Sequence, residues 1–334
     1  MTSEQTGIRV REARHDDYEA IAAFTTDTWP ERDGGDYIPR IYHDWIEGDD
    51  QRTVVAEIDG EVAGLAQSVL LSEWEAWNQG LRVHPDYRGR GVSVAVTEDL
   101  FEWAREQGAR TASVMVFSWN EAGLGQSRAC GYAPTTEFRW AHPEPDPDAM
   151  PRRDAAVDAT VTSDPDAAWR FWTASDARDH LRGFALDDDE SWALSQLTRD
   201  HLRAAADDDG LLVVQDDGTK GFAHRVREYE RDTGDGEDEG DGEQDGDGGT
   251  ESDESDGGDE TETWVEYGVG AWEDLSSANA LLAAVARDAA DRGADRTRVL
   301  IPETVRAVSD AAACRVEVSD EPDFVLSADL TTEG

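Results

Sequence analysis

Apolar residues in the first half of the chain follow two patterns, the period of a helix and the alternation of a strand. Val92, Val96, Leu100 and Ala104 recur at helical spacing, and Gly108 follows where that helix is expected to end. Apolar runs predict strands over residues 8–10, 53–58, 62–71, 74–83, 111–117 and 138–141. Further helices are predicted over residues 16–24 and 120–129. This order predicts a mixed α/β fold, with a hairpin-rich early sheet and a later βαβ unit.

The second half repeats this order more weakly. Strands are predicted over residues 211–215, 221–229, 264–272, 298–301 and 316–330, and helices over residues 167–174, 192–206, 276–292 and 303–312. The order strand, turn, strand, strand, helix, strand, helix recurs after about 160 residues. We therefore expect a duplicated domain, in which two tandem copies share one α/β (α+β mixed sheet) fold.

Two segments interrupt these patterns. Proline and acidic residues alternate through residues 142–152, which predicts an extended linker. Residues 232–262 contain 16 Asp or Glu, no Lys or Arg, and no aliphatic or aromatic residue. Such a segment cannot bury a core and is predicted to be disordered. The predicted domains are therefore residues 1–141 and 153–334, with the acidic loop 232–262 inside the second.

The charge of the chain restricts its partners. It has 76 Asp or Glu against 30 Lys or Arg, a formal net charge of -46. Phosphate backbones and anionic lipids need clustered cations, so the composition argues against nucleic acid and membrane as partners. Lys220 is the single lysine, and arginine supplies the remaining cations. This composition resembles that of proteins from salt-in halophiles, where molar salt screens self-repulsion. An acidic mesophilic protein with a skewed composition is the alternative.

A few residues predict where the protein is located in the cell and whether it binds a metal ion. Cys130 and Cys314 are too few for a disulfide framework and indicate a reducing interior. The first ten residues lack the apolar core of a signal peptide, and the apolar helical stretch 278–290 is too short to span a membrane. A cytoplasmic protein is expected. The acidic residues 241–252 imitate the start of a calcium loop, but Ser252 stands where a bidentate Glu is needed, so no metal is expected.

The most informative segment runs from Leu81 to Ser93. An apolar strand ends at Val83, and a proline turn, a basic glycine-rich loop with Arg88 and Arg90, and an amphipathic helix follow. Glycines let the backbone approach a ligand closely, successive amides point toward it, and the helix N-terminus adds partial positive charge. The segment therefore predicts an anion-binding site.

These residues resemble the acetyl-CoA-binding motif of the GNAT N-acetyltransferase superfamily, Arg/Gln-x-x-Gly-x-Gly/Ala. Arg88 and Gly91 match the first two positions, and Ser93 replaces the usual Gly or Ala. A second resemblance lies downstream, where Asn120 begins a helix that ends in Cys130-Gly131-Tyr132. The resemblance covers residues 8–140. It implies two tandem domains of the acyl-CoA N-acyltransferase fold, the second a degenerate copy.

The resemblance also implies a mechanism. The pyrophosphate of acetyl-CoA would lie on the amides of the loop, and Asn120 would bind the cosubstrate or else only cap its helix. The loop residues concerned are Arg88, Gly89, Arg90, Gly91, Val92 and Ser93. The main chain near Val83 would bind the pantetheine arm and stabilise the oxyanion as a primary amine attacks the thioester directly.

The catalytic side chains are less well defined by the motif. Glu73 and Glu75 are candidate bases, with solvated hairpin charges as the alternative. Ser127 stands where many family members place the Tyr that serves as general acid. Either solvent is then expected to protonate the thiolate, or the activity is expected to be weak. Cys130 is expected to be packed rather than catalytic, and His84 to stabilise its turn.

The acceptor remains open at this stage. Trp29, Tyr37, Tyr42 and Trp45 lie in the segment that forms the acceptor side in the family, although plain helix packing explains them equally well. A small-molecule or peptide amine is expected, on a monomer or homodimer. Residues 269–276 correspond to the cosubstrate loop but lack arginine, which indicates that the second copy has lost acetyl-CoA binding. A non-catalytic acyl-CoA-binding or scaffold protein is the alternative function.

Overall fold

The computed structural model describes residues 7–26, 28, 36–151, 159–232 and 261–332. Two compact units make up the chain. The first unit consists of Met1–Thr135 together with Phe324–Gly334, and the second of Thr136–Asp323. The final segment of the chain therefore belongs to the first unit.

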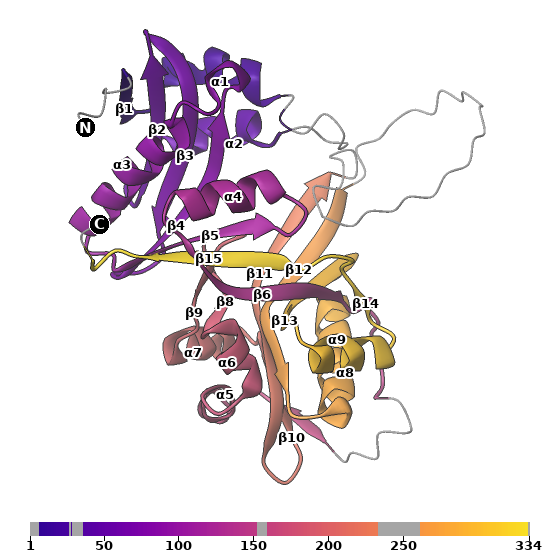
Figure 1. Cartoon of the computed structure of the whole chain (residues 1–334). Helices are drawn as coiled ribbons and strands as arrows, with labels where there is room; N and C mark the ends of the chain where they lie inside the picture. The colour runs from indigo at the N-terminus through magenta and orange to yellow at the C-terminus, as the bar shows by residue number, and fades with distance from the viewer. Residues whose placement is uncertain (1–6, 27, 29–35, 152–158, 233–260, 333–334) are drawn as a thin grey trace, which may run out of the picture. The chain divides into compact units, whose positions relative to one another are not determined.

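The first unit is built on a mixed sheet (Figure 1). Its strands follow the order β1 (Ile8–Glu12), β2 (Gln51–Ile58), β3 (Glu61–Leu70), β4 (Glu75–Val83), β5 (Thr111–Phe117) and β15 (Asp323–Asp329). The first four strands are antiparallel neighbours, and β4 and β5 are parallel. Asp59 and Gly60 form the β2–β3 turn with positive φ, as the hairpin signal predicts.

Helices cover both faces of this sheet because its strands alternate between two apolar layers. Val54 and Ala56 pack with the helix α3 (Val92–Glu106), and Val55 packs with α1 (Tyr18–Thr25) and α2 (Ile38–Trp45) on the other face. The helix α4 (Glu121–Ala129) contributes Leu124 to the cluster that contains Phe101 of α3. Figure 1 shows α3 crossing the sheet.

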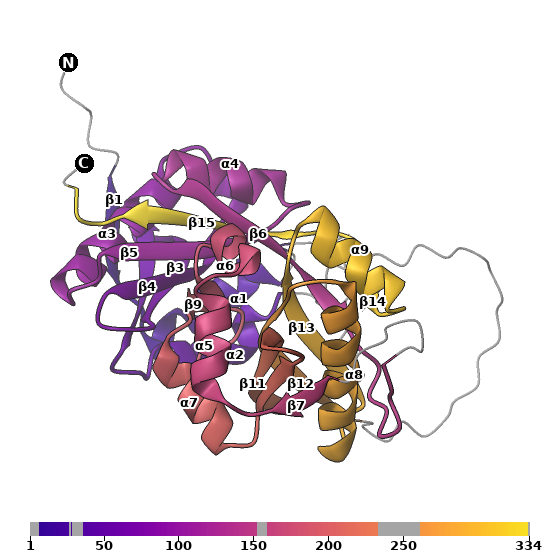
Figure 2. The same ribbon diagram turned by 90° about the horizontal axis from the view of Figure 1, so that it is seen from below.

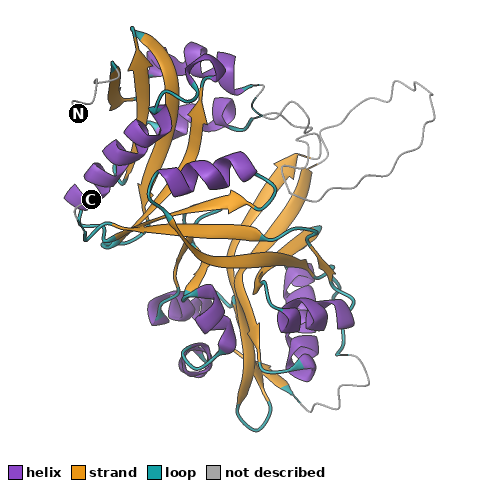
Figure 3. Cartoon of the chain, in the orientation of Figure 1, coloured by secondary structure: helices purple, strands orange, loops and turns teal. Residues whose placement is uncertain are grey.

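The second unit has a comparable plan (Figures 2 and 3). Its strands follow the order β6 (Ala133–His142), β13 (Arg296–Pro302), β12 (Thr261–Trp272), β11 (Thr219–Asp232), β10 (Leu211–Gln215) and β7 (Thr160–Thr162), with β14 (Glu317–Val318) also beside β6. On β11, Ala223 faces α8 (Leu275–Asp291) and Phe222 contacts Trp172 of α5 (Pro165–Trp172). The other elements are α6 (Asp176–Leu181), α7 (Arg199–Asp207), α9 (Val305–Ala313) and the separate hairpin β8 (Phe184–Leu186) and β9 (Leu194–Gln196).

Both units repeat one order of elements. Strands β2, β3, β4 and helix α3, then β5 and α4, correspond in order to β10, β11, β12, α8, β13 and α9. The strand that completes each unit does not follow this order along the chain: β15 lies beside β5, and β6 lies beside β13. The limits of a sequence repeat need not coincide with those of a compact unit. The predicted domain limits, 1–141 and 153–334, therefore stay a prediction. The degenerate second copy also stays a prediction.

One predicted helix is wrong. The apolar residues between 192 and 206 have helical spacing, but Leu194–Gln196 form β9 and the helix begins only at Arg199. Thr198 is the reason, because its side chain accepts from the amide of His201 and caps α7 at this point. The prediction also missed α6 and β8, which are too short to show a period.

The acidic segment 232–262 lies almost entirely outside the described residues, so its predicted disorder stays a prediction. The strands on either side of it pair to their ends, with Asp232 opposite Thr261. Among the described helices, none combines the length and the apolar character needed to cross a membrane.

A buried histidine in the second unit makes its stability depend on pH. His224 on β11 is 1% exposed, and neither ring nitrogen has a hydrogen-bond partner among the described residues. Burial, with a smaller contribution from His201, lowers the pKa of His224 to about 3. The folded unit therefore holds this imidazole neutral, while the unfolded chain binds a proton below its ordinary pKa of about 6.5.

We expect His224 to destabilise the fold progressively as the pH falls from about 6.5 toward 3, by about 1.4 kcal/mol per pH unit. His224→Phe should remove this part of the pH dependence. The measurement is the free energy of unfolding from urea titrations between pH 6 and pH 4, at constant molar KCl. Since every other titrating group is common to both proteins, an identical slope in the variant would contradict this assignment.

Candidate functional site

The two central strands of the first unit separate partway along their length. β4 pairs with β5 only through Glu75, Ala76 and Trp77, as far as the described residues show, although β4 continues to Val83. A bulge lies in the free part of β4, where Leu65 of β3 is opposite Arg82 but Gln67 is opposite Gln79. The strands therefore leave a gap beyond Trp77, where β4 has no further ladder pair with β5 among the described residues.

Gly80 makes the bulge possible. Its φ is +63°, and a Cβ there would lie 2.1 Å from a ring carbon of Trp45 on α2. Only glycine fits both the left-handed backbone and this close contact. The bulge was not predicted, but a single glycine inside an apolar strand is the signal that could have found it.

The basic loop lies directly after β4. A 3-10 turn over Pro85–Tyr87 follows Val83, and His84 Nδ1 accepts from the Asp86 amide at 3.2 Å, so His84 stabilises the turn. Gly89 and Gly91 have φ of +74° and +89°. Arg88, Gly89, Arg90 and Gly91 are all exposed.

The N-terminus of α3 is open to a ligand. Gly91 is its N-cap, no side chain caps it, and its first turn contains no acidic residue. No side chain of the helix therefore bonds to its first backbone amides or offsets the partial positive charge at its N-terminus. The arginines on the preceding loop add to this charge. The arrangement has the parts of a site for a phosphate or pyrophosphate group.

The corresponding helix of the second unit is closed to such a ligand. Only residues 273–274 separate β12 from α8, whereas residues 84–91 separate β4 from α3. The carboxylate of Asp274 accepts from the Ser277 amide at 2.9 Å, and this bond holds its pKa below the ordinary value. The second unit therefore supplies its own anion to the helix N-terminus.

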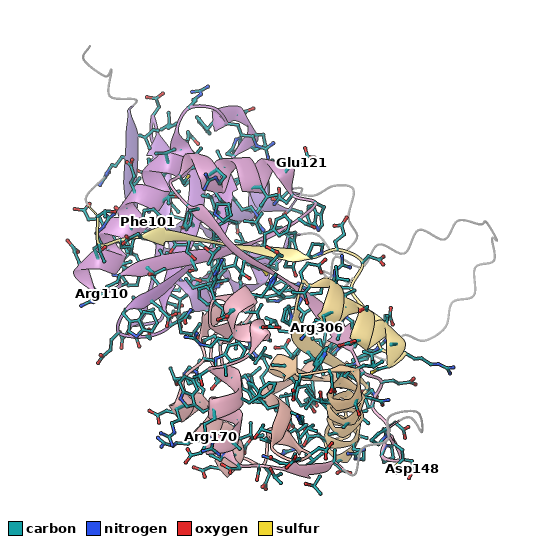
Figure 4. All side chains as sticks on the ribbon, turned by 60° about the horizontal axis from the view of Figure 1, so that its bottom comes forward. Phe101, Arg110, Glu121, Asp148, Arg170 and Arg306 are labelled. Atoms are coloured by element: carbon teal, nitrogen blue, oxygen red, sulfur yellow. The ribbon has the colours of Figure 1, made fainter. Side chains whose placement is uncertain are left out.

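Residues after β5 take structural positions. Asn120 Oδ1 accepts from the Gly123 amide at 2.8 Å and caps α4, whose first residue, Glu121, is labelled in Figure 4. Burial raises the pKa of the Cys130 thiol, against the smaller opposing effect of Thr97 and Ser93 of α3. Ser127 is buried.

Glu73 and Glu75 are not brought to the gap. Glu75 is buried at the end of β4 that is paired with β5 and accepts from Ser72 Oγ at 3.0 Å, and Glu73 is exposed just before it. Val83 is eight positions beyond Glu75 along the strand, roughly 26 Å at about 3.3 Å per residue.

Aromatic side chains of α2, and of Tyr37 just before it, lie on the face of β4 opposite α3. Tyr42 is fully buried, and its hydroxyl donates to the Arg14 carbonyl, so it packs the helices. Trp45 lies against the bulge, and Tyr37 lies under the Arg82 guanidinium at 5.5 Å. Trp29 is outside the described residues. An ion pair between Arg82 and the buried Asp36, with Nε–Oδ2 2.6 Å, was not predicted from the sequence.

One match to a known family lies within the first unit. Residues 12–132 match the model of the acetyltransferase (GNAT) family. Histidine N-acetyltransferase from Xenopus tropicalis is 46% identical over 61 residues, 18% of this chain and 19% of that protein. The protein of the same name from Scomber australasicus is 30% identical over 90 residues, 27% and 26% of the two chains. The chain therefore spans only a small part of these curated relatives.

A solved structure extends the likeness to nearly the whole chain. GCN5-related N-acetyltransferase from Sphaerobacter thermophilus is similar over 97% of this chain and 96% of that one, with 14% identity and a TM-score of 0.52. This likeness shows the fold, and it confirms the predicted mixed α/β class.

Proposed function

We propose that this protein, whose residues 12–132 match the acetyltransferase (GNAT) family, is an acetyl-CoA-dependent N-acetyltransferase acting on a primary amine. The observation that carries the proposal is the uncapped N-terminus of α3, which follows the loop of Arg88 and Arg90 at the open end of the β4–β5 gap. A pyrophosphate joined to an extended arm matches an anion site that continues into a gap between strands.

The roles of the residues follow from this placement. The amides of residues 88–93 would bind the pyrophosphate, with Arg88 and Arg90 as the charged groups. The β4 backbone near Val83 would bind the pantetheine arm and donate to the oxyanion. The amine nitrogen bonds to the acyl carbon, the carbon–sulfur bond breaks, and the thiolate leaves. The remote position of Glu73 and Glu75 favours water as the acceptor of the amine proton.

The acceptor is proposed as a small-molecule or peptide amine. Histidine, the acceptor in the name of the two matched relatives, is the first compound to test. Buried Ser127 and remote Glu73 and Glu75 favour a second candidate, a non-catalytic acyl-CoA-binding protein. Release of free thiol in the presence of an amine panel separates the two.

Calorimetric titration of acetyl-CoA into the protein in molar KCl tests the site. We expect wild type to bind and Gly91→Glu to lose more than about tenfold in affinity, because the carboxylate enters the anion site and closes the approach. Gly60→Glu is the matched control, since Gly60 has φ of +88° and open space around it in the β2–β3 turn. Folded wild type that binds no acetyl-CoA would refute the proposal.

A further inference from the structure

Two histidine side chains meet on the surface of the first unit. His15 lies in the 3-10 turn His15–Asp17 before α1, and His43 lies in the last turn of α2, the helix beside α1 (Figure 1). Their Nδ1 atoms are 3.1 Å apart. The ring centroids are 5.2 Å apart, so these two nitrogens lie between the rings and face each other. The tertiary fold brings together two imidazoles that no local sequence pattern joins.

Neighbouring side chains hold both rings in this position. The His43 ring stacks on Tyr18 of α1, with centroids 5.0 Å apart, and packs edge to face against Tyr42 at 5.7 Å. Glu47 Oε1 lies 3.6 Å from His15 Nε2. The negative charge of this carboxylate favours the His15 proton on Nε2, which leaves the Nδ1 lone pair facing His43. His15 therefore presents an electron-pair donor toward the second imidazole.

The spacing of the two nitrogens suits a shared metal ion as well as a shared proton. Transition metals bind imidazole nitrogen at about 2.0–2.1 Å. Two bonds of this length, from nitrogens 3.1 Å apart, meet at the ion at an angle of about 100°. This angle lies between the octahedral and the tetrahedral values. A carboxylate behind the ring is the usual partner of a metal-binding histidine, and Glu47 has that place at His15.

We propose that His15 and His43 bind one divalent transition-metal ion of the class that prefers imidazole, such as Ni²⁺ or Zn²⁺, through their Nδ1 atoms. Within the described residues no three His, Cys, Asp or Glu side chains are grouped to hold an ion, so water completes the coordination. The His15 side chain is 61% exposed and His43 is also exposed, which leaves access for this water. The ion links the turn before α1 to the last turn of α2 and thereby stabilises the first unit.

Calorimetric titration of Ni²⁺ into the untagged chain tests the site, in molar KCl to screen the acidic surface. We expect one Ni²⁺ to bind wild type with a Kd on the order of 1–100 µM, about half the binding free energy of a four-ligand site. Mg²⁺ prefers carboxylate oxygens and should bind more weakly. His43→Phe keeps a ring against Tyr18 without a ligand nitrogen, and His15→Ala removes the other imidazole. Each variant should lose more than about tenfold in Ni²⁺ affinity.

Unfolding by urea provides a second readout. At a free Ni²⁺ concentration ten times the Kd, the folding equilibrium constant of the first unit should rise about tenfold in wild type, because the ion binds the folded pair and not the separated histidines. His43→Phe should show no such rise, although its ring still packs between α1 and α2.

His180→Gln in the second unit is the matched control. His180 Nε2 lies 3.7 Å from Glu137 Oε1, much as His15 does from Glu47, but it contacts the Glu137 carbonyl at 3.0 Å instead of a second imidazole. This variant should bind Ni²⁺ as wild type does. Equal Ni²⁺ affinity in wild type, His43→Phe and His15→Ala would overturn the inference, as would wild type that binds Ni²⁺ no more tightly than Mg²⁺. Neither titration involves acetyl-CoA, so the proposed function is tested separately.

Discussion

Removing residues 324–334 is expected to unfold the first unit, although every residue of its basic glycine-rich loop remains. β15 occupies the place beside β5 in that unit. Leu326, Ala328 and Leu330 are buried in the same cluster as Ala112 and Val116 of β5. Each apolar side chain of leucine size contributes about 1.5–3 kcal/mol on burial.

Hydrogen bonds of the same segment add to this loss. Ser327 Oγ lies 2.9 Å from Ser113 Oγ, and the Leu330 carbonyl accepts from Arg105 Nε at 3.1 Å. Together these terms reach the order of 5 kcal/mol, comparable with the whole stability of a typical domain. The truncated chain should then lose acetyl-CoA binding as well.

Urea unfolding in molar KCl, with hydrogen exchange of the β5 amides, measures this effect. A shorter truncation that removes only residues 331–334 is the control, because Thr331 and Thr332 are exposed. Native protection of β5 in the longer truncation would show that the first unit folds without β15.

Arg82→Met should be the most damaging single substitution near the site, at about 3–5 kcal/mol, because it leaves a buried carboxylate without its cation. The Asp36 side chain is 0% exposed, and Arg82 is 11% exposed. Asp36 also accepts a hydrogen bond from the Ile38 amide at the start of α2. When Asp36 loses Arg82, the substitution therefore also disturbs α2, the helix that contacts the β4 bulge.

A double-mutant cycle identifies the cause. Asp36→Asn combined with Arg82→Met should cost clearly less than the two single changes added together, since no charge is left unpaired. Arg9→Met is the control, because Arg9 is 73% exposed in its pair with Glu57 and should contribute no more than about 1 kcal/mol. Additive effects in the cycle would show that the ion pair is not what stabilises this region.

Much of the first unit could be predicted because its signals are local. The Asp59–Gly60 turn, the helix from Val92 and the cap at Asn120 depend on residues a few positions apart, and the structure has all three. The second unit was less predictable where its elements are short. The strand β9 has three residues, too few to show the period of apolar positions that distinguishes a strand from a helix.

The candidate site also has a part that could be predicted from the sequence and a part that could not. The loop of Arg88–Ser93 could be recognised because its glycines, cations and following helix are contiguous in sequence. Gly80 and Arg82 could not be assigned, because their partners Trp45 and Asp36 come from distant segments. Glu73 and Glu75 were candidate bases because they lie at the head of the strand that leads to Val83, and the extended strand keeps them far from its other end.

The sequence by itself determined the mixed α/β class, the repeated order of elements and the basic glycine-rich loop before a helix, because periodicity, turn residues and helix ends are properties of neighbouring residues. Only the tertiary structure decided which strand completes each sheet, where β4 leaves β5, and that Asp274 closes the second helix N-terminus while Gly91 leaves the first one open. These features depend on pairing and burial between residues far apart in the chain, and the free energy of such contacts has no local signature.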